Sequence, residues 1–167
     1  MRLLYRSGFI TSAGVCAMAL AASVAADTVY DISLVQDGVV NVTEYPVMPG
    51  RHDVIMGVSE WSAPSPDDPS SPFRGLTGIC FGMTEFKGDE VVGGNGYCTY
   101  EDAEGDTYVS SWIPRASPAP GKSTGEWTAV GGTGKFEGAT GSGVYETVRL
   151  GSGGRQRTLT GKITLRD

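Results

Sequence analysis

The sequence predicts an all-β protein built as a single closed antiparallel β-barrel of about eight strands. Short segments rich in β-branched and aromatic residues are separated by turn signals every 8–12 residues or so, roughly the spacing of sandwiches and barrels. No 3.6-residue hydrophobic period is sustained after the N-terminal segment, so long helices are not expected. The stretch 125–146 interleaves seven glycines with Trp127, Phe136 and Tyr145. This composition permits bulges and sharp bends, which favours a closed barrel.

The first 26 residues are predicted to be a secretory signal peptide, followed by one β-barrel domain over residues 27–167. The segment starts with Arg2 and Arg6, continues with an apolar run and ends in small residues, which is the order found in signal peptides. A membrane anchor is the alternative, but the apolar run is shorter than the ~20 residues of a spanning helix. We therefore expect cleavage at the end of this segment and no membrane insertion of the mature chain.

The charge of the chain is acidic, with 19 Asp and Glu residues against 13 Lys and Arg residues and a formal net charge of −6. Because Arg2 and Arg6 leave with the signal peptide, the mature charge is about −8. Nucleic acids and anionic membranes attract basic surfaces, so neither is expected as a partner.

The first predicted strand covers 28–35, where alternation places three apolar side chains on one face, Tyr30, Ile32 and Leu34. Asp37 and Gly38 form a turn signal. A second strand is therefore expected over 39–47 and a third over 52–61.

Two proline-rich segments, 62–72 and 114–120, are predicted to be surface loops. The other predicted strands run over 74–86, 91–101, 106–113, 123–130, 138–150 and 157–166. In the last of these, alternation places Leu159, Ile163 and Leu165 on one face and Lys162 with the threonines on the other.

Two cysteines remain after the signal peptide, Cys80 and Cys98, and an even pair in an oxidising compartment predicts a disulfide. If a turn is centred on 87–90, the two residues lie opposite each other on paired strands. The bridge would close a loop of about 19 residues and stabilise the fold by ~3 kcal/mol. A catalytic thiol is the alternative, but the sequence offers it no evident histidine partner.

A family resemblance is carried by the glycine motifs GGTGKF at 131–136 and GATGSG at 138–143, together with GIC at 78–80, GYC at 96–98 and DAEGD at 102–106. These motifs resemble those of the allene oxide cyclase and dirigent-like β-barrels, particularly their small secreted bacterial relatives of unassigned function. The resemblance implies a calycin-like barrel, a periplasmic location and assembly into a homodimer or homotrimer. No catalytic residue of the plant cyclases can be matched to a position of this chain.

Six aromatic residues are the candidate ligand-binding set: Trp61, Tyr97, Tyr108, Trp112, Trp127 and Tyr145. Aromatic walls with a few polar tips are typical of small-molecule pockets. The same residues would equally well fill a barrel that holds no ligand. An acid that points inward would add acid–base chemistry, because burial raises the pKa of a carboxyl group. The candidates for this role are Glu60, Glu126 and Glu146.

Three other features of the sequence suggest a cofactor or metal site, but each lacks a residue that such a site needs, so no cofactor and no metal is expected. The glycines before Lys135 lack the spacing of a phosphate-binding loop, since Phe136 stands where Ser or Thr is needed. The acids of 102–106 suggest a calcium loop but lack its glutamate at the twelfth position, so a turn with solvated acids is expected. His52 is the single histidine and has no partners for a triad or a zinc site.

Three functions remain open. The first is a non-enzymatic module that binds a small apolar or aromatic molecule inside the barrel. The second is a cofactor-independent cyclase or isomerase in which a buried polar group assists a shaped substrate. The third is a structural or interaction protein whose barrel is filled by its own side chains.

Overall fold

The computed structural model describes residues 26–48, 52–62, 70–88, 90–116, 119 and 121–166. The predicted signal peptide therefore lies almost wholly outside the described residues, as does most of the predicted loop 62–72. The side chain of His52 is also outside them. In the described part, no helix has the length and hydropathy of a membrane span.

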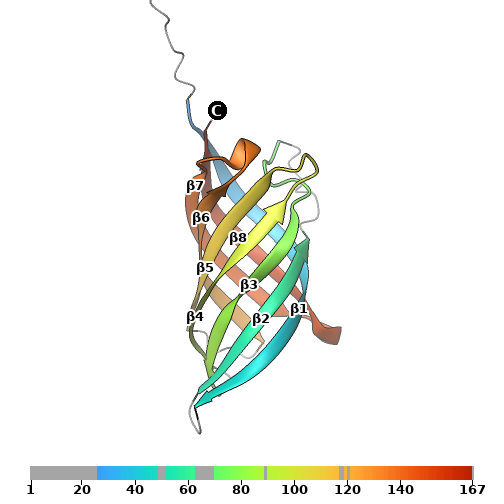
Figure 1. Cartoon of the computed structure of the whole chain (residues 1–167), viewed down its shortest axis with the longest axis vertical. Helices are drawn as coiled ribbons and strands as arrows, with labels where there is room; N and C mark the ends of the chain where they lie inside the picture. Colours follow the sequence, from blue (N-terminus) through green and yellow to red (C-terminus); the bar gives the residue numbers. More distant parts are fainter. Residues whose placement is uncertain are drawn as a thin grey trace, which may run out of the picture.

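Eight antiparallel strands form a closed barrel, in which each strand pairs with the next and the last pairs with the first (Figure 1). This confirms the predicted fold class. The strands are β1 (Thr28–Met48), β2 (His52–Ser62), β3 (Thr77–Lys87), β4 (Glu90–Glu101), β5 (Thr107–Arg115), β6 (Lys122–Gly132), β7 (Thr140–Arg149) and β8 (Gly154–Leu165). Two short 3₁₀-helices, η1 (Gly134–Phe136) and η2 (Gly151–Gly153), lie in the β6–β7 and β7–β8 connections.

The predicted turn at Asp37 and Gly38 is wrong, because β1 continues through both residues. The first part of β1 pairs with β8 as far as Val39, and the second part pairs with β2 from Asp37 onward. Gly38 serves a different purpose there: a Cβ atom on it would lie 2.5 Å from the Trp61 ring. The glycine makes room for an aromatic ring of the neighbouring strand instead of turning the chain.

The predicted disulfide hairpin is confirmed. Cys80 of β3 and Cys98 of β4 are direct partners in the register and are joined by a disulfide. Both are buried, so the bridge lies inside the barrel. The turn lies between Lys87 and Glu90, which form the last pair of the ladder.

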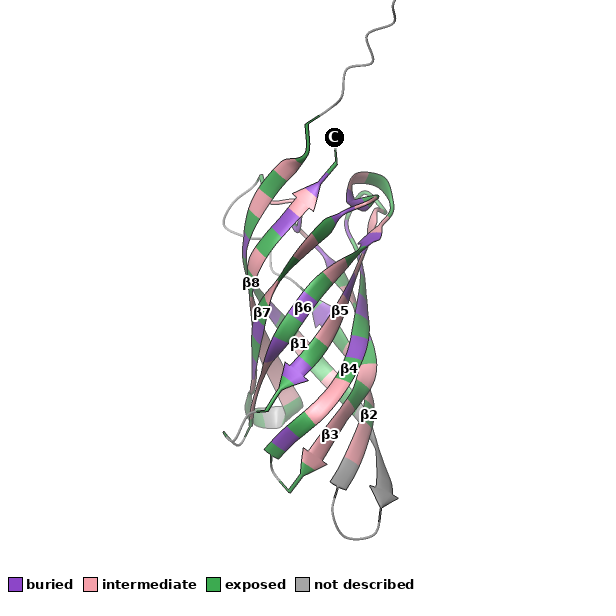
Figure 2. Ribbon diagram, turned by 90° about the vertical axis from the view of Figure 1, so that its left-hand side faces the viewer, coloured by how far each residue is buried: buried purple, intermediate pink, exposed green. Residues whose placement is uncertain are grey.

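Buried and exposed residues alternate along the strands, as Figure 2 shows, because successive side chains of a strand point to opposite faces. The end of the barrel that holds the β4–β5 and β6–β7 connections is filled by four aromatic residues, here called the aromatic plug: Phe73, Tyr100, Tyr108 and Phe136. The Tyr108 ring lies 5.2 Å from that of Phe73 and 5.3 Å from that of Phe136, centroid to centroid. A cavity of about 20 Å³ lies inside the barrel beside the plug.

Aromatic rings inside the barrel lie against glycines of neighbouring strands. A Cβ atom would lie 2.5 Å from the Trp112 ring if placed on Gly82, and 2.8 Å from the Trp127 ring if placed on Gly161. Gly125 makes room for Tyr145 in the same way. At all three glycines the Cβ would also lie 2.3 Å from a backbone oxygen of a neighbouring strand, so glycine is needed both for the rings and for the close approach of the strands.

Candidate functional site

The other end of the barrel is open and contains a cavity of about 490 Å³. Its wall includes residues of all eight strands and reaches the β3–β4 turn and the β5–β6 connection. The apolar part of the wall includes Val40, Ile55, Phe86, Val91, Trp112 and Tyr145. The interior is thus filled in one half and open in the other, a division that the sequence did not indicate.

Arg157 of β8 lies at the inner end of this cavity. Its guanidinium carbon is 3.9 Å from the centroid of the Trp61 ring and 5.5 Å from that of Tyr145. Its Nη1 group contacts the disulfide sulfurs, at 3.4 Å from Cys80 and 3.7 Å from Cys98. Aromatic faces and sulfur atoms hold the guanidinium in place without neutralising its charge.

Two further arginines line the cavity closer to its mouth. Arg149 and Arg155 are direct partners across β7 and β8, and Arg155 and Arg157 share a face of β8. Burial lowers the pKa of Arg155, and the positive charges of Arg149 and Arg157 lower it further. Lys122 also lines the cavity, but its ammonium pairs with Glu146 at 2.7 Å.

Trp112 and Tyr145 bring polar groups to the apolar wall. The Trp112 indole N–H is buried and has no hydrogen-bonding partner among the described residues. Burial raises the pKa of the Tyr145 hydroxyl, opposed by the charge of Arg157 and by a hydrogen bond with Ser123. A buried donor without a partner is unfavourable, so an acceptor that reached Trp112 would be stabilised.

The structure brings five of the six predicted aromatic residues into the interior and leaves one outside. Trp112 and Tyr145 line the open cavity, Trp61 lies behind Arg157, and Trp127 and Tyr108 are buried in the filled part. Tyr97 is 47% exposed on the outer face, which corrects its assignment to the pocket. The reason is alternation, because its neighbour Cys98 points inward.

None of the three carboxylates considered for acid–base chemistry points inward. Glu60, Glu126 and Glu146 are all exposed, and Glu126 forms an ion pair with Arg115 on the outer face. Among the described residues, the cavity wall contains no Asp or Glu.

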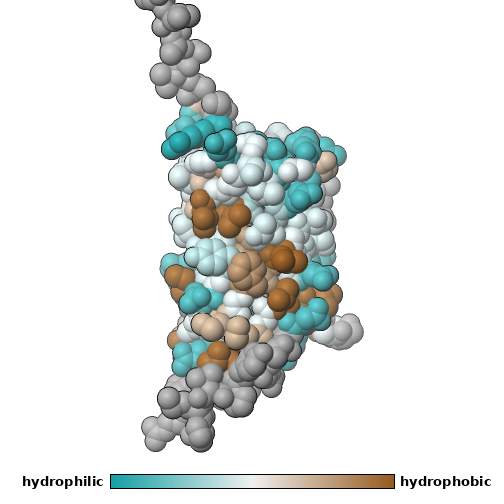
Figure 3. All heavy atoms as spheres, in the orientation of Figure 1, coloured by the Kyte–Doolittle hydropathy of each residue, from teal (hydrophilic) through white to brown (hydrophobic). Residues whose placement is uncertain are grey.

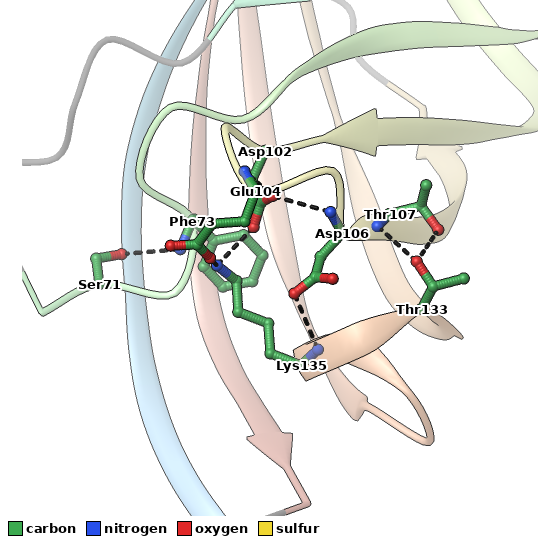
Figure 4. Close-up of polar contacts among 8 residues, drawn as sticks. All are labelled: Ser71, Phe73, Asp102, Glu104, Asp106, Thr107, Thr133 and Lys135. Carbon is green, nitrogen blue, oxygen red and sulfur yellow. Dashed lines mark hydrogen bonds and ion pairs between the residues drawn. The ribbon is translucent and has the colours of Figure 1, made fainter.

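The acids of 102–106 lie at the plugged end, where the Lys135 ammonium pairs with Asp102 and Glu104 (Figure 4). The Lys135 ammonium is 2.5 Å from Asp102 Oδ2 and 2.8 Å from Glu104 Oε2. Asp102 Oδ1 accepts hydrogen bonds from the backbone N–H groups of Glu104 and Asp106. Burial acts to raise the pKa of Asp102, but Lys135 and the two N–H groups outweigh it and hold this pKa below its ordinary value. Oxygen atoms of Asp102, Glu104 and Asp106 lie within 4.8 Å of one another, and the Lys135 ammonium pairs with two of these three acids and so stabilises the turn.

The arginines are the site residues that the sequence prediction missed. Alternation predicts that Leu159, Ile163 and Leu165 share one face, and the structure shows that this is the inner face, where Ile163 and Leu165 are buried and Leu159 packs against the core. The same alternation, extended toward the start of β8, puts Arg157 and Arg155 on that face. The signal was therefore present, but arginine is normally an exposed residue.

The outer face of β2, β3 and β4 carries an apolar patch, visible as brown side chains in Figure 3. We call this the outer apolar face. Each of its members is at least 41% exposed: Met56, Val58, Ile79, Phe81, Met83 and Tyr97.

The fold and cavity define a closed eight-stranded antiparallel barrel with one plugged end and one open, basic end. Among solved structures, it is similar to a pterocarpan synthase dirigent protein, GePTS1, with a TM-score of 0.49 and 15% sequence identity over 84% of this chain and 86% of that chain. No protein-family model and no curated protein matches the sequence. The likeness to GePTS1 concerns the fold alone, and the relation to allene oxide cyclases remains a prediction from the glycine motifs.

Proposed function

We propose that the protein is a non-enzymatic binding module that holds a small, partly apolar organic molecule in the open half of its barrel. The observation that carries this proposal is the cavity of about 490 Å³. Ligand pockets have volumes of roughly 300–1,000 Å³, and this cavity lies in that range. About half of its wall is polar, and Trp112 and Tyr145 supply the aromatic part.

The side chains of the cavity favour binding over catalysis by a cyclase or isomerase. General acid–base catalysis is most efficient when a group exchanges protons near the working pH. Arginines remain protonated in proteins, and burial raises the pKa of Tyr145. Neither kind of group exchanges protons readily near neutral pH.

We further propose that the mature protein works in the periplasm. The buried disulfide fits an oxidising compartment. The predicted signal peptide supplies the route of export.

Native mass spectrometry of protein purified from its own host tests the binding proposal. We expect a bound small molecule that is released on denaturation. A Thr84→Trp variant should lose it, because Thr84 lines the cavity and a tryptophan there would fill it. Thr128→Trp is the matched control, since Thr128 is exposed on β6. The proposal would be contradicted if the wild-type protein carried no small molecule and also bound none from an extract of the host's small molecules.

The outer apolar face supports a second proposal, self-association through β2, β3 and β4. Exposed apolar patches of this kind mark contact surfaces, and a patch can meet its own copy across a two-fold axis. Phe81 of β3 and Tyr97 of β4 are direct partners in the register, and their ring centroids lie 6.2 Å apart on this face. Light scattering should show an oligomer that Phe81→Lys converts to a monomer, while Val144→Lys on exposed β7 should leave it intact. A monomeric wild type at micromolar concentration would contradict the proposal.

A further inference from the structure

We infer that the molecule held in the cavity is an organic anion, whose acidic group is bound by Arg149, Arg155 and Arg157 and whose apolar body lies against Trp112 and Tyr145. This inference rests on the proposed binding function and adds the charge and polarity of the ligand. A carboxylate or a sulfonate would both supply the acidic group.

The first argument is the convergence of three guanidinium groups on one cavity. Arg149 and Arg155 face each other across β7 and β8. Arg157 follows two residues along β8, where its Nε donates to Thr147 Oγ1 at 3.4 Å. Residues placed in this way project from the same face of the sheet, so their charges collect at one side of the cavity.

The second argument is the absence of a counter-charge within the protein. Among the described residues, no ion pair joins Arg149, Arg155 or Arg157 to a carboxylate. The chain has an excess of acids, 19 against 13 basic residues, and it pairs other cations with them: Lys122 with Glu146 and Lys162 with Asp31. Three neighbouring cations repel one another, and the partial burial of Arg155 strengthens the repulsion that it experiences. An anion from outside would remove this repulsion.

The third argument concerns the kind of anion. Guanidinium groups match the geometry of carboxylate and sulfonate oxygens, and they can donate two parallel hydrogen bonds. Stacking on Trp61 fixes Arg157 before a ligand arrives, which reduces the entropy lost on binding. A small inorganic anion would leave the apolar wall around Val40, Ile55 and Phe86 unused. The wall and the charges together therefore select a molecule with an apolar body and one acidic group.

Two fluorescent probes that differ only in charge test the inference. Anilinonaphthalene sulfonate carries a sulfonate on its aromatic rings, and phenylnaphthylamine has the same rings without it. Titrations would use the wild type, Arg155→Gln, Arg115→Gln and Thr84→Trp. Arg115→Gln removes the same charge from the outer face, where Arg115 pairs with Glu126. Thr84→Trp fills the cavity, so any probe that still binds this variant is bound elsewhere, for example on the outer apolar face.

We expect Arg155→Gln to weaken sulfonate binding by about tenfold or more and to change binding of the neutral probe by less than about twofold. Arg115→Gln should change neither, and Thr84→Trp should abolish both. If both probes bind the wild type with equal affinity, and Arg155→Gln changes the two affinities by the same factor, the inference is overturned while the binding function stands. If neither probe binds, or if both still bind Thr84→Trp, the cavity is not a site for such molecules and both proposals fail. Thermal unfolding of each variant without probe confirms that it is folded.

Discussion

Reduction of the disulfide between Cys80 and Cys98 is expected to lower the free energy of unfolding by about 3 kcal/mol. The two residues are separated by 18 positions, so the bond closes a short loop in the unfolded chain. For a loop of this size, the chain-entropy relation gives about 11 cal/mol/K, or roughly 3 kcal/mol at 25 °C. With an unfolding entropy of about 2.1 cal/mol/K per residue over a domain of about 140 residues, the melting temperature should fall by roughly 10 °C. The folded hairpin itself should change little, because Cys80 and Cys98 are already direct partners in its register.

Urea and thermal unfolding of three samples would check this value: oxidised wild type, reduced wild type and Cys80→Ala/Cys98→Ala. The reduced wild type keeps both sulfur atoms, so its loss of stability reports the cross-link alone. The double variant also removes two buried sulfurs that contact Arg157, and should lose a further ~1–2 kcal/mol. The reductant should have no effect on the double variant. Reduced wild type that unfolds within about 1 kcal/mol of the oxidised protein would refute the loop-entropy reasoning.

Asp102→Asn should lower stability at neutral pH by about 1–3 kcal/mol, because a buried charged acceptor is lost. The pKa of Asp102 is depressed in the folded state, so its contribution to the free energy of unfolding is present above the ordinary pKa of about 4 and is lost as the pH falls through the folded-state pKa. The free energy of unfolding of Asp102→Asn should therefore depend less on pH in this acid range than that of the wild type. Gly143→Ala should cost about 1–3 kcal/mol in urea unfolding, because its Cβ would lie 1.9 Å from the Thr160 backbone oxygen and 2.7 Å from Trp127 Nε1. Gly151→Ala, whose Cβ meets no atom within 4 Å, should stay within about 0.5 kcal/mol. Alkaline titration followed by ultraviolet absorbance should show three tyrosines that ionise above the ordinary pKa of about 10, because burial raises the pKa of each: Tyr100, Tyr108 and Tyr145. Their ionisation at pH 10 in the folded protein would contradict the buried positions.

The sequence predicted the barrel, the strand alternation of β8 and the disulfide hairpin, because each depends on spacing within one or two neighbouring strands. The prediction of a turn at Asp37 and Gly38 is wrong because it used neighbouring residues alone. A turn signal is local, whereas the use of Gly38 depends on the Trp61 ring from β2. Local sequence cannot distinguish a glycine that turns the chain from one that accommodates a distant side chain.

The candidate site was predicted less completely. Tyr97 could have been placed outside from the inward direction of Cys98, and Arg155 from the alternation of β8. The division of the interior into a filled and an open half was not accessible in this way. It depends on Phe73 and Phe136, which lie outside the barrel strands and fold over one end. Such packing is a property of the assembled molecule and leaves no period in the sequence.

The contact between rings and glycines bears on how this protein can change over evolutionary time. A Cβ atom on Gly82 or Gly96 would lie within 2.5 Å of the Trp112 ring and also 2.3 Å from a backbone carbonyl oxygen of the paired strand. Shortening Trp112 would therefore deepen the cavity toward the bare backbone of these two glycines, but it would not allow either of them to become larger. In related barrels the size of the ring residue should thus set the depth of the cavity, and their ligands could differ in size while the number of strands and their hydrogen-bonded register stay the same.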